Sequence, residues 1–258
     1  MAGTALPGRL KERLAWRVAR LVAVRDETPT ARTLVLAVPG WPGHLAGQRV
    51  DLRLTAADGY STRRSYSLAA PADGERVELT IQKVPGGEVS PYLTEVFSVG
   101  DPLELRGPVG GWFVWRPADT APVLLVAGGS GLVPLMAMVR ARRAAGSRVP
   151  FRLICSVRTP EDLYYAAELR DAAGRDPGLD VTRFYTRAVP DHWMSPPRRL
   201  RAADLAAAGW PPDFQPTCYV CGPTGFVEEV ADALVEIGHD PERIRTERFG
   251  PSGSSARG

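Results

Sequence analysis

Short runs of alternating hydrophobic and polar residues fill the first part of the chain. Three of these runs are rich in β-branched residues, and their period of two is typical of strands that bury one face. They cover residues 32–38, 48–54 and 76–82. Turn sequences such as Pro39-Gly40 and Asp73-Gly74 separate them. The pattern predicts an antiparallel β-barrel or sandwich over residues 17–117, with one helical segment at residues 90–99.

The pattern changes near residue 118. From there, short apolar runs alternate with segments that have helical spacing. The expected strands are residues 123–127, 151–155, 181–185 and 219–221, and the expected helices are residues 132–145, 161–173 and 226–237. Such alternation is typical of a parallel sheet with crossover helices, so we expect an α/β domain over residues 118–250. Residues 1–16 would form an N-terminal extension, and residues 251–258 a disordered tail.

The composition is that of an ordinary globular enzyme. The chain has 258 residues, of which 44% are hydrophobic and 24% charged, so it can bury a substantial core in one or two domains. No run approaches the ~20 apolar residues that cross a bilayer, and no signal-peptide core follows the basic N-terminus. We therefore expect a cytoplasmic protein without a membrane span. The net charge of +3 is small and the basic residues are dispersed, which argues against nucleic acid as a partner.

The three cysteines are too few for a disulfide framework. Cys218 and Cys221 form a C-x-x-C sequence, but on a strand their side chains would point to opposite faces. The sequence has no second cysteine pair and its three histidines are scattered, so we expect no metal site. Three thiolates also cannot supply the four ligands of an iron–sulfur cluster, so we expect the chain to carry none.

The first candidate for chemistry is the sequence Arg64-Ser65-Tyr66-Ser67. On a strand, Arg64 and Tyr66 share a face, so a guanidinium that can grip a pyrophosphate would lie beside a ring that can stack on a planar ligand. The same residues also fit a barrel strand with an exposed arginine and a packed tyrosine.

The second candidate is the turn at Gly86-Gly87, which leads into the helical segment. Ser90 suits the N-cap and Pro91 the first helical position, and free backbone N–H groups at such a start can bind a phosphate. A capped turn without a ligand would have the same sequence.

Two glycine motifs follow predicted strands in the second half. The first is Gly128-Gly129-Ser130-Gly131, with Pro134 three residues later, and the second is Cys221-Gly222-Pro223. A buried strand that ends in glycines at a helix start lets the backbone approach a dinucleotide and presents the helix dipole to its phosphates. Two such ends in one sheet indicate one cleft, although a tight connection remains the alternative for each.

The order of these features resembles the ferredoxin–NADP reductase superfamily, in the branch that includes oxygenase reductases and flavin reductases. The resemblance covers residues 16–250. It rests on Arg64-x-Tyr66-Ser67, Gly86-Gly87-x-x-Ser90, Gly128-Gly129-x-Gly131-x-x-Pro134, Cys221-Gly222-Pro223 and Glu247-x-Phe249-Gly250. It implies an antiparallel β-barrel that binds FAD over residues 17–117, followed by an NAD(P)-binding α/β domain over residues 118–250.

The resemblance also implies roles for individual residues. Arg64 would bind a flavin phosphate, Tyr66 would stack on the isoalloxazine, and Ser67 would lie near its N5. The remaining cofactor-binding residues are Ser65, the pyrophosphate segment Gly86, Gly87, Val89 and Ser90, and the nicotinamide dinucleotide segment Gly128, Gly129, Ser130, Gly131 and Pro134, together with Gly222 and Pro223.

Three of these positions are candidates for catalysis. Ser67 would hydrogen-bond N5, Cys221 would set the depth of the nicotinamide, and Glu247 would relay a proton or orient the ring. Phe249 would close over the flavin beside Glu247. A salt bridge of Glu247 with a neighbouring arginine at the surface is the structural alternative.

The choice of cofactors follows from phosphate contacts. Two separate phosphate-gripping motifs favour FAD over FMN. The second strand of the parallel sheet is followed by Ser156 and Arg158 rather than by an acid, and Arg187 follows the next strand. Two guanidiniums beside a serine suit a 2′-phosphate, so we expect NADPH rather than NADH.

The electron acceptor is expected to be a separate redox protein, such as a ferredoxin, because the chain is expected to hold no cluster. The basic segment 9–17 could contact an acidic partner, or it could be a solvated extension. A flavin reductase that releases reduced flavin and a non-catalytic redox sensor are the alternatives.

Overall fold

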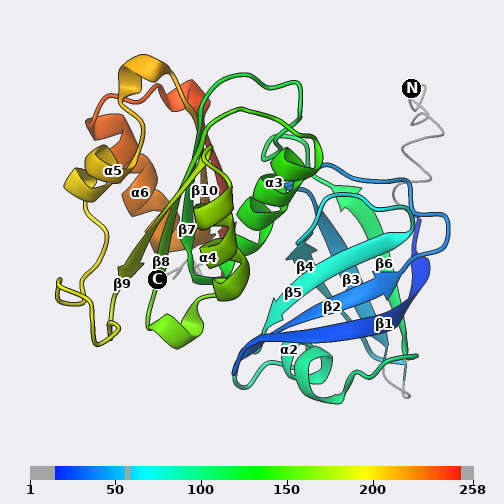
Figure 1. The fold of residues 1–258 in the computed structure, drawn as a ribbon. Helices are drawn as coiled ribbons and strands as arrows, with labels where there is room; N and C mark the ends of the chain where they lie inside the picture. Colours follow the sequence, from blue (N-terminus) through cyan, green and yellow to red (C-terminus); the bar gives the residue numbers. More distant parts are fainter. Residues whose placement is uncertain (1–14, 56–58, 251–258) are drawn as a thin grey trace, which may run out of the picture.

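The computed structural model describes residues 15–55 and 59–250, which form two sheets side by side (Figure 1). The tail expected at residues 251–258 and nearly all of the extension expected at residues 1–16 lie outside the described residues. No helix within the described ranges is long and apolar enough to cross a membrane.

The first sheet contains six antiparallel strands in the order β4-β3-β6-β1-β2-β5. Its strands are β1 (Arg17–Thr28), β2 (Ala31–Ala37), β3 (Arg49–Thr55), β4 (Ser61–Ser67), β5 (Arg76–Gln82) and β6 (Pro102–Val109). The edge strands β4 and β5 meet beyond Ser67 through a bridge between Leu68 and Leu79, which gives the sheet a barrel-like form. Apolar residues of all six strands fill its interior, so the expected antiparallel architecture is confirmed.

The helical segment of this half comprises α2 (Val89–Pro91) and a π-helical turn, η1 (Tyr92–Val96). The expectation of Ser90 as N-cap is wrong, because Glu88 holds that position and the helix begins at Val89. Ser90 lies inside the helix, and its hydroxyl accepts a hydrogen bond from the Val84 backbone N–H at 3.0 Å. Ser90 therefore stabilises the preceding turn from a position inside the helix.

The second sheet contains five parallel strands in the order β11-β10-β7-β8-β9. These are β7 (Val123–Gly128), β8 (Phe151–Val157), β9 (Leu179–Tyr185), β10 (Thr217–Pro223) and β11 (Ile244–Phe249). Helices α3 (Leu132–Ala144) and α4 (Ala166–Arg175) cover one face, and α5 (Ala202–Ala208) and α6 (Thr224–Glu236) cover the other (Figure 1). The expected alternation is confirmed, although α4 begins later than expected and α5 was not expected.

Buried contacts join the two halves. The apolar core under α3 and α4 extends to Phe113 and Trp115, which follow the last barrel strand. The hydroxyl of Tyr219 donates to the Val114 carbonyl at 2.8 Å, and Arg140 Nη1 donates to the Ala69 carbonyl at 2.7 Å. The halves therefore meet through a packed interface, and any site between them is lined by well-packed residues.

Candidate active site between the two sheets

The two glycine motifs of the parallel sheet touch each other. Strands β7 and β10 are neighbours, with Ala127 paired to Cys221. A Cβ on Gly131 would lie 2.0 Å from the Cys221 carbonyl oxygen, and a Cβ on Gly222 would lie 2.7 Å from the ring of Phe226. Only glycine fits where the backbones approach this closely. The structure thus brings both motifs to one end of the sheet.

A cleft of about 200 Å³ opens beside these glycines, at the carboxyl ends of the strands. This is where open α/β sheets bind their ligands. Its walls come from the ends of β7, β8, β10 and β11 and from the end of the barrel strand β5. They are Gly128, Gly129, Ser130, Ser156, Val157, Arg158, Asp162, Tyr164, Thr186, Pro223, Phe226, Phe249 and Gln82. Seven of the positions expected to bind a cofactor therefore line one cleft.

A second cleft of about 490 Å³ continues the first toward α5 and α6. The two share Ser156, Thr186, Pro223 and Phe226, and the second adds Arg199 and Arg201. Together they form an elongated surface that can accommodate an extended ligand with phosphate groups.

Arg158 and Arg187 lie next to each other, since the Arg187 N–H donates to the Arg158 carbonyl at 2.9 Å. Both side chains are exposed, and neither forms a salt bridge within the described part of the chain. Arg158 lines the smaller cleft, whereas Arg187 lines neither of the two. Arg158 is therefore the better placed of the two to meet a bound anion.

Glu247 lies at the junction of the two sheets. Its Oε1 accepts a hydrogen bond from Arg49 Nη1 at 3.2 Å, and Arg49 comes from strand β3 of the barrel. Its Oε2 is buried and has no partner among the described residues. The side chain is only 16% exposed, and burial raises the pKa of its carboxyl. The salt bridge considered from the sequence is present, but it joins the two halves and leaves one oxygen unpaired.

Ser67 and Cys221 are the strand partners of the two residues of this ion pair. Ser67 pairs with Arg49 across β3 and β4, and Cys221 pairs with Glu247 across β10 and β11. Burial raises the pKa of the Cys221 thiol well above its usual value, so the sulfur is a neutral thiol at neutral pH. The ion pair between Arg49 and Glu247 thus joins the strands that carry the three residues proposed for catalysis at the junction of the sheets.

The β4 residues divide between the two faces of their strand. Arg64 and Tyr66 are opposite Leu52 and Val50, whose side chains face the barrel interior. Tyr66 is half-buried, and burial raises its pKa to about 12. Ser65 points the other way, where its hydroxyl donates to Asp51 at 2.6 Å. Arg64 and Tyr66 are therefore placed together as expected, and Ser65 is already engaged elsewhere.

Six residues that line the smaller cleft were not found from the sequence, and these are Gln82, Val157, Asp162, Tyr164, Thr186 and Phe226. Phe226 has the clearest signal, because it is the only aromatic residue in the first turn after Cys221-Gly222-Pro223. Its ring would meet a Cβ on either Gly128 or Gly222. Asp162 and Tyr164 lie on the connection between β8 and α4, which sequence patterns described only as part of a helix.

Comparisons with known proteins agree with this arrangement. Residues 19–114 match the model of the oxidoreductase FAD-binding domain, and residues 125–232 match that of the oxidoreductase NAD-binding domain. The chain is similar to the ferredoxin–NAD(P)(+) reductase component of the naphthalene 1,2-dioxygenase system of Pseudomonas putida. They are 33% identical over 193 residues, which are 74% of this chain and 57% of that protein.

A longer match is the reductase subunit of the aromatic O-demethylase of an Amycolatopsis species. It is 30% identical over 255 residues, covering 96% of this chain and 74% of the relative. The crystal structure of the Amycolatopsis cytochrome P450 reductase GcoB superposes with a TM-score of 0.79 at 29% identity, over 92% of this chain and 71% of that one. The chain spans between half and three fifths of the length of the first three curated relatives.

Proposed function

The chain belongs to the ferredoxin reductase-like family of NAD(P)H-dependent FAD oxidoreductases, and on this premise we propose that it passes electrons from NAD(P)H through bound FAD to a separate redox protein. The observation that carries the proposal is the junction of the two sheets, where the Arg49–Glu247 ion pair joins the strands that hold Ser67 and Cys221, close to a glycine-lined cleft. We assign residues 17–117 to the FAD-binding domain and residues 118–250 to the NAD(P)-binding domain.

The barrel residues would hold the flavin. FAD, when bound, accepts two electrons with a hydride and gives them up one at a time. Arg64 would pair with a phosphate and Tyr66 would stack on the flavin ring, since both lie on the same face of β4. The turn at Gly86 and Gly87, with Val89 and Ser90, would present backbone N–H groups to the pyrophosphate.

The residues of the parallel sheet would position the nicotinamide. The close contact of Gly131 with Cys221 lets the backbone reach the dinucleotide, and the neutral Cys221 thiol limits how deeply the nicotinamide enters. The unpaired Oε2 of Glu247 would hold or pass a proton at the junction, which its raised pKa favours. Phe249, at the end of β11, would cover the open side.

We also propose that NADPH is preferred over NADH. Arg158 lines the cleft beside Ser156, and Arg187 is bonded to it through the backbone. A 2′-phosphate in the cleft would meet Arg158, and Arg187, which lines neither cleft, would add a second positive charge nearby; neither has a salt-bridge partner in the described part of the chain.

This preference is tested by the ratio of kcat/KM values for NADPH and NADH. Arg158→Ala should lower the ratio, because the 2′-phosphate loses its nearest cation. Arg170→Ala, an exposed position on α4 remote from both clefts, is the matched control. An Arg158→Ala ratio equal to that of the control would reject the assignment.

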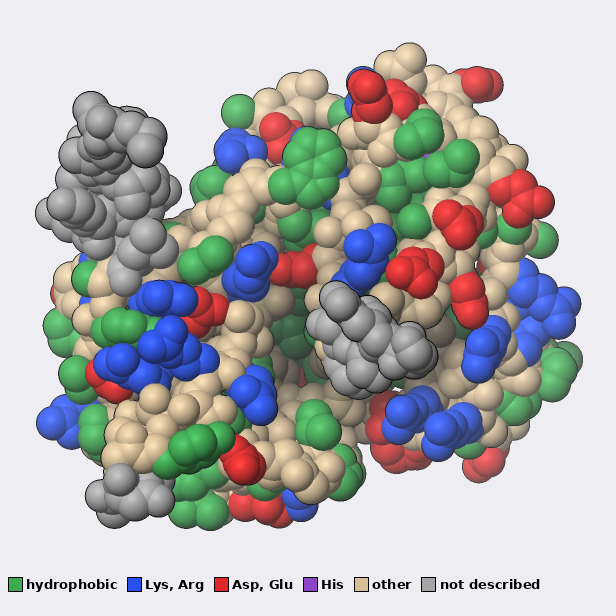
Figure 2. All heavy atoms as spheres, turned by 180° about the vertical axis from the view of Figure 1, so that it is seen from behind, with side chains coloured by type: hydrophobic (Ala, Val, Ile, Leu, Met, Phe, Trp, Pro, Cys, Tyr) green, Lys and Arg blue, Asp and Glu red, His purple; other side chains and the backbone are tan. Residues whose placement is uncertain are grey.

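A separate redox protein is the acceptor that we favour. The naphthalene dioxygenase relative is named a ferredoxin–NAD(P)(+) reductase component. The barrel half also presents a cluster of basic side chains beside the described start of the chain (Figure 2). There the guanidiniums of Arg53, Arg63 and Arg106 lie 4.4, 5.4 and 5.0 Å from the ring of Trp16. Arg53 is paired with Glu104 and Arg106 with Asp51, so the surplus positive charge of this cluster comes from Arg63, which would help to steer an acidic partner.

Anaerobic stopped-flow separates this acceptor from free flavin. The reduced enzyme is mixed with an acidic ferredoxin or with free FMN at several salt concentrations. We expect fast oxidation by the ferredoxin that slows as salt rises, because the basic surface is then screened. Fast turnover with micromolar FMN, together with no reaction with ferredoxins, would instead establish the flavin reductase.

A further inference from the structure

Tyr164 is a buried tyrosine whose hydroxyl has no partner. Its side chain is 2% exposed, and its Oη forms no hydrogen bond within the described residues. It nevertheless lines the smaller cleft, together with Ser130 and Gln82. A buried hydroxyl without a partner is costly, and such groups are commonly completed by a ligand or water.

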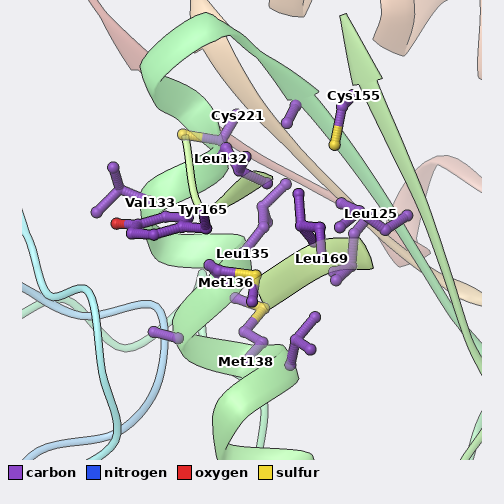
Figure 3. Packing of buried hydrophobic residues seen from close by; sticks show 14 of the residues in the cluster. Leu125, Leu132, Val133, Leu135, Met136, Met138, Cys155, Tyr165, Leu169 and Cys221 are labelled. Carbon is purple, nitrogen blue, oxygen red and sulfur yellow. The ribbon is translucent and has the colours of Figure 1, made fainter. Parts of the chain in front are cut away.

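The neighbouring residue fixes this tyrosine in place. Tyr165 has a φ of +55°, a left-handed conformation that is uncommon outside glycine and is often found at functional sites. Its hydroxyl lies 2.5 Å from Thr80 Oγ1 in the barrel, and the Arg140 guanidinium lies 4.6 Å from its ring centre. Figure 3 shows its ring against α3, close to Val133.

This anchoring sets the direction of Tyr164. The two tyrosine rings are nearly perpendicular, at 83°, with centres 6.3 Å apart. Tyr165 is held in the interface with the barrel, so the preceding side chain in sequence is turned into the cleft. A second hydrogen bond, 2.7 Å between Thr80 and Thr33, secures the barrel end of the anchor.

Arg158 and Asp162, two other polar residues of the cleft, are charged, so neither supplies an uncharged hydrogen-bond donor. Arg158 supplies a cation, and Asp162 Oδ2 already accepts from the backbone and the hydroxyl of Thr159, both at 3.2 Å. Burial raises the pKa of the Tyr164 hydroxyl, so it keeps its proton at neutral pH. It can therefore donate to a ribose or phosphate oxygen.

We propose that the Tyr164 hydroxyl donates a hydrogen bond to a ribose or phosphate oxygen of the bound dinucleotide. Tyr164 shares the smaller cleft with Phe249 and Gln82, at the junction of the sheets, and with Arg158, to which the proposed function assigns the 2′-phosphate. This inference rests on the proposed function, because it takes the cleft to be the nicotinamide dinucleotide site.

The test compares whole dinucleotides with their adenosine halves by isothermal titration calorimetry. The probes are NADP⁺ against 2′,5′-ADP, and NAD⁺ against AMP, each titrated into the FAD-loaded protein. Tyr164→Phe removes only the hydroxyl. It should raise the Kd of both dinucleotides about 3- to 10-fold, the range for one neutral hydrogen bond, and the Kd values of the adenosine halves then show which half of the dinucleotide accepts the bond.

Thermal unfolding without nucleotide gives an independent reading. Removing an unpaired buried hydroxyl should leave Tm unchanged or raise it, whereas loss of a structural hydrogen bond would lower it. Tyr185→Phe is the matched control, because Tyr185 is also buried but lines a groove on the other side of β9 with His192 and Trp193. It should change none of the dissociation constants.

The outcomes are distinct. Unchanged dinucleotide affinity in Tyr164→Phe overturns the inference while the proposed function stands. Weakened dinucleotide binding at an unchanged or raised Tm supports the inference, whether or not the adenosine halves are also weakened. A lowered Tm with uniform weakening assigns the hydroxyl to structure and also overturns it. Failure of the unmodified protein to bind any of the four probes would remove the proposed function and the inference together.

Discussion

Adding one methyl group at Gly131 should separate the two glycine motifs. In Gly131→Ala the new Cβ would lie 2.0 Å from the Cys221 carbonyl oxygen and 2.8 Å from the Gly222 nitrogen. Both contacts are with backbone, so no side chain can rotate out of the way. The end of β10 must instead move away from the start of α3.

The size of this movement sets the expected cost. An ordinary contact for a Cβ begins at 3.4 Å, so the carbonyl must retreat by roughly 1.4 Å. Overpacking a well-packed site typically costs about 1–3 kcal/mol. For a chain of this size, that corresponds to a fall in Tm of about 3–10 °C. Because Cys221 and Gly222 move with β10, dinucleotide binding should weaken, while FAD content stays near that of the unmodified protein.

Gly174→Ala is the matched control. Gly174 is in the last turn of α4 and lines neither cleft, and its Cβ would enter open space. Helix propensity then favours alanine by roughly 0.5–1 kcal/mol, so Tm should rise slightly. Differential scanning fluorimetry and NADP⁺ titration measure both effects. Equal Tm values for the two variants would refute the argument that the backbone contact excludes a side chain at Gly131.

Three further outcomes are expected. Arg64→Ala should lower the FAD-to-protein ratio of the purified enzyme without destabilising the flavin-free chain by more than ~0.5 kcal/mol, and chromatography of heat-released flavin should give FAD rather than FMN. Glu247→Gln should slow flavin reduction by about 10²-fold in single-turnover kinetics. Because burial raises the pKa of Glu247 above 4.5, its protonated form stabilises the fold fully below pH 4.5, and that stability is lost as pH rises through the higher folded value. Urea unfolding should therefore show that the stability of Glu247→Gln gains on that of the unmodified protein as pH rises above 4.5, and the 42% exposed Arg49 can be hydrated in the variant. Phe226→Ala should weaken NADP⁺ binding at unchanged FAD content, measured by calorimetry, because the ring packs on both glycine motifs and borders both clefts.

Local patterns were sufficient for the two-domain architecture and for most of its strands. Strands β2, β3, β5 and β7 to β10 have clear periods of two or continuous apolar runs, and glycines mark where β7 and β10 end, whereas β1, β6 and β11 were not expected from the sequence. The N-cap of α2 could not be predicted from the sequence. Serine is a common N-cap residue, but in this chain the Ser90 hydroxyl accepts a hydrogen bond from the Val84 backbone N–H. Glu88 precedes the first helical turn and is therefore the N-cap.

The site could be predicted only where neighbours in sequence are neighbours in space. Arg64 and Tyr66 share a strand face, which alternation gives directly. The ion pair between Arg49 and Glu247 joins residues 198 positions apart and depends on how the two sheets dock. Tyr164 faces the cleft only because Tyr165 adopts a left-handed backbone held by Thr80. Such contacts arise from tertiary packing, and no single-chain pattern encodes them.

All three cysteines of the chain are buried, so the folded protein should react slowly with thiol reagents. Burial raises the pKa of Cys155 and of Cys218 to about 12 and that of Cys221 well above its usual value. Because thiolates are the reactive species, maleimides should leave the native chain unmodified at pH 7. A single cysteine placed at exposed Val99 on the barrel half, and another at Arg170 on α4, would then be labelled selectively. Spectroscopic distance measurements between those two labels could then follow the distance between the two halves during turnover in an otherwise unaltered enzyme.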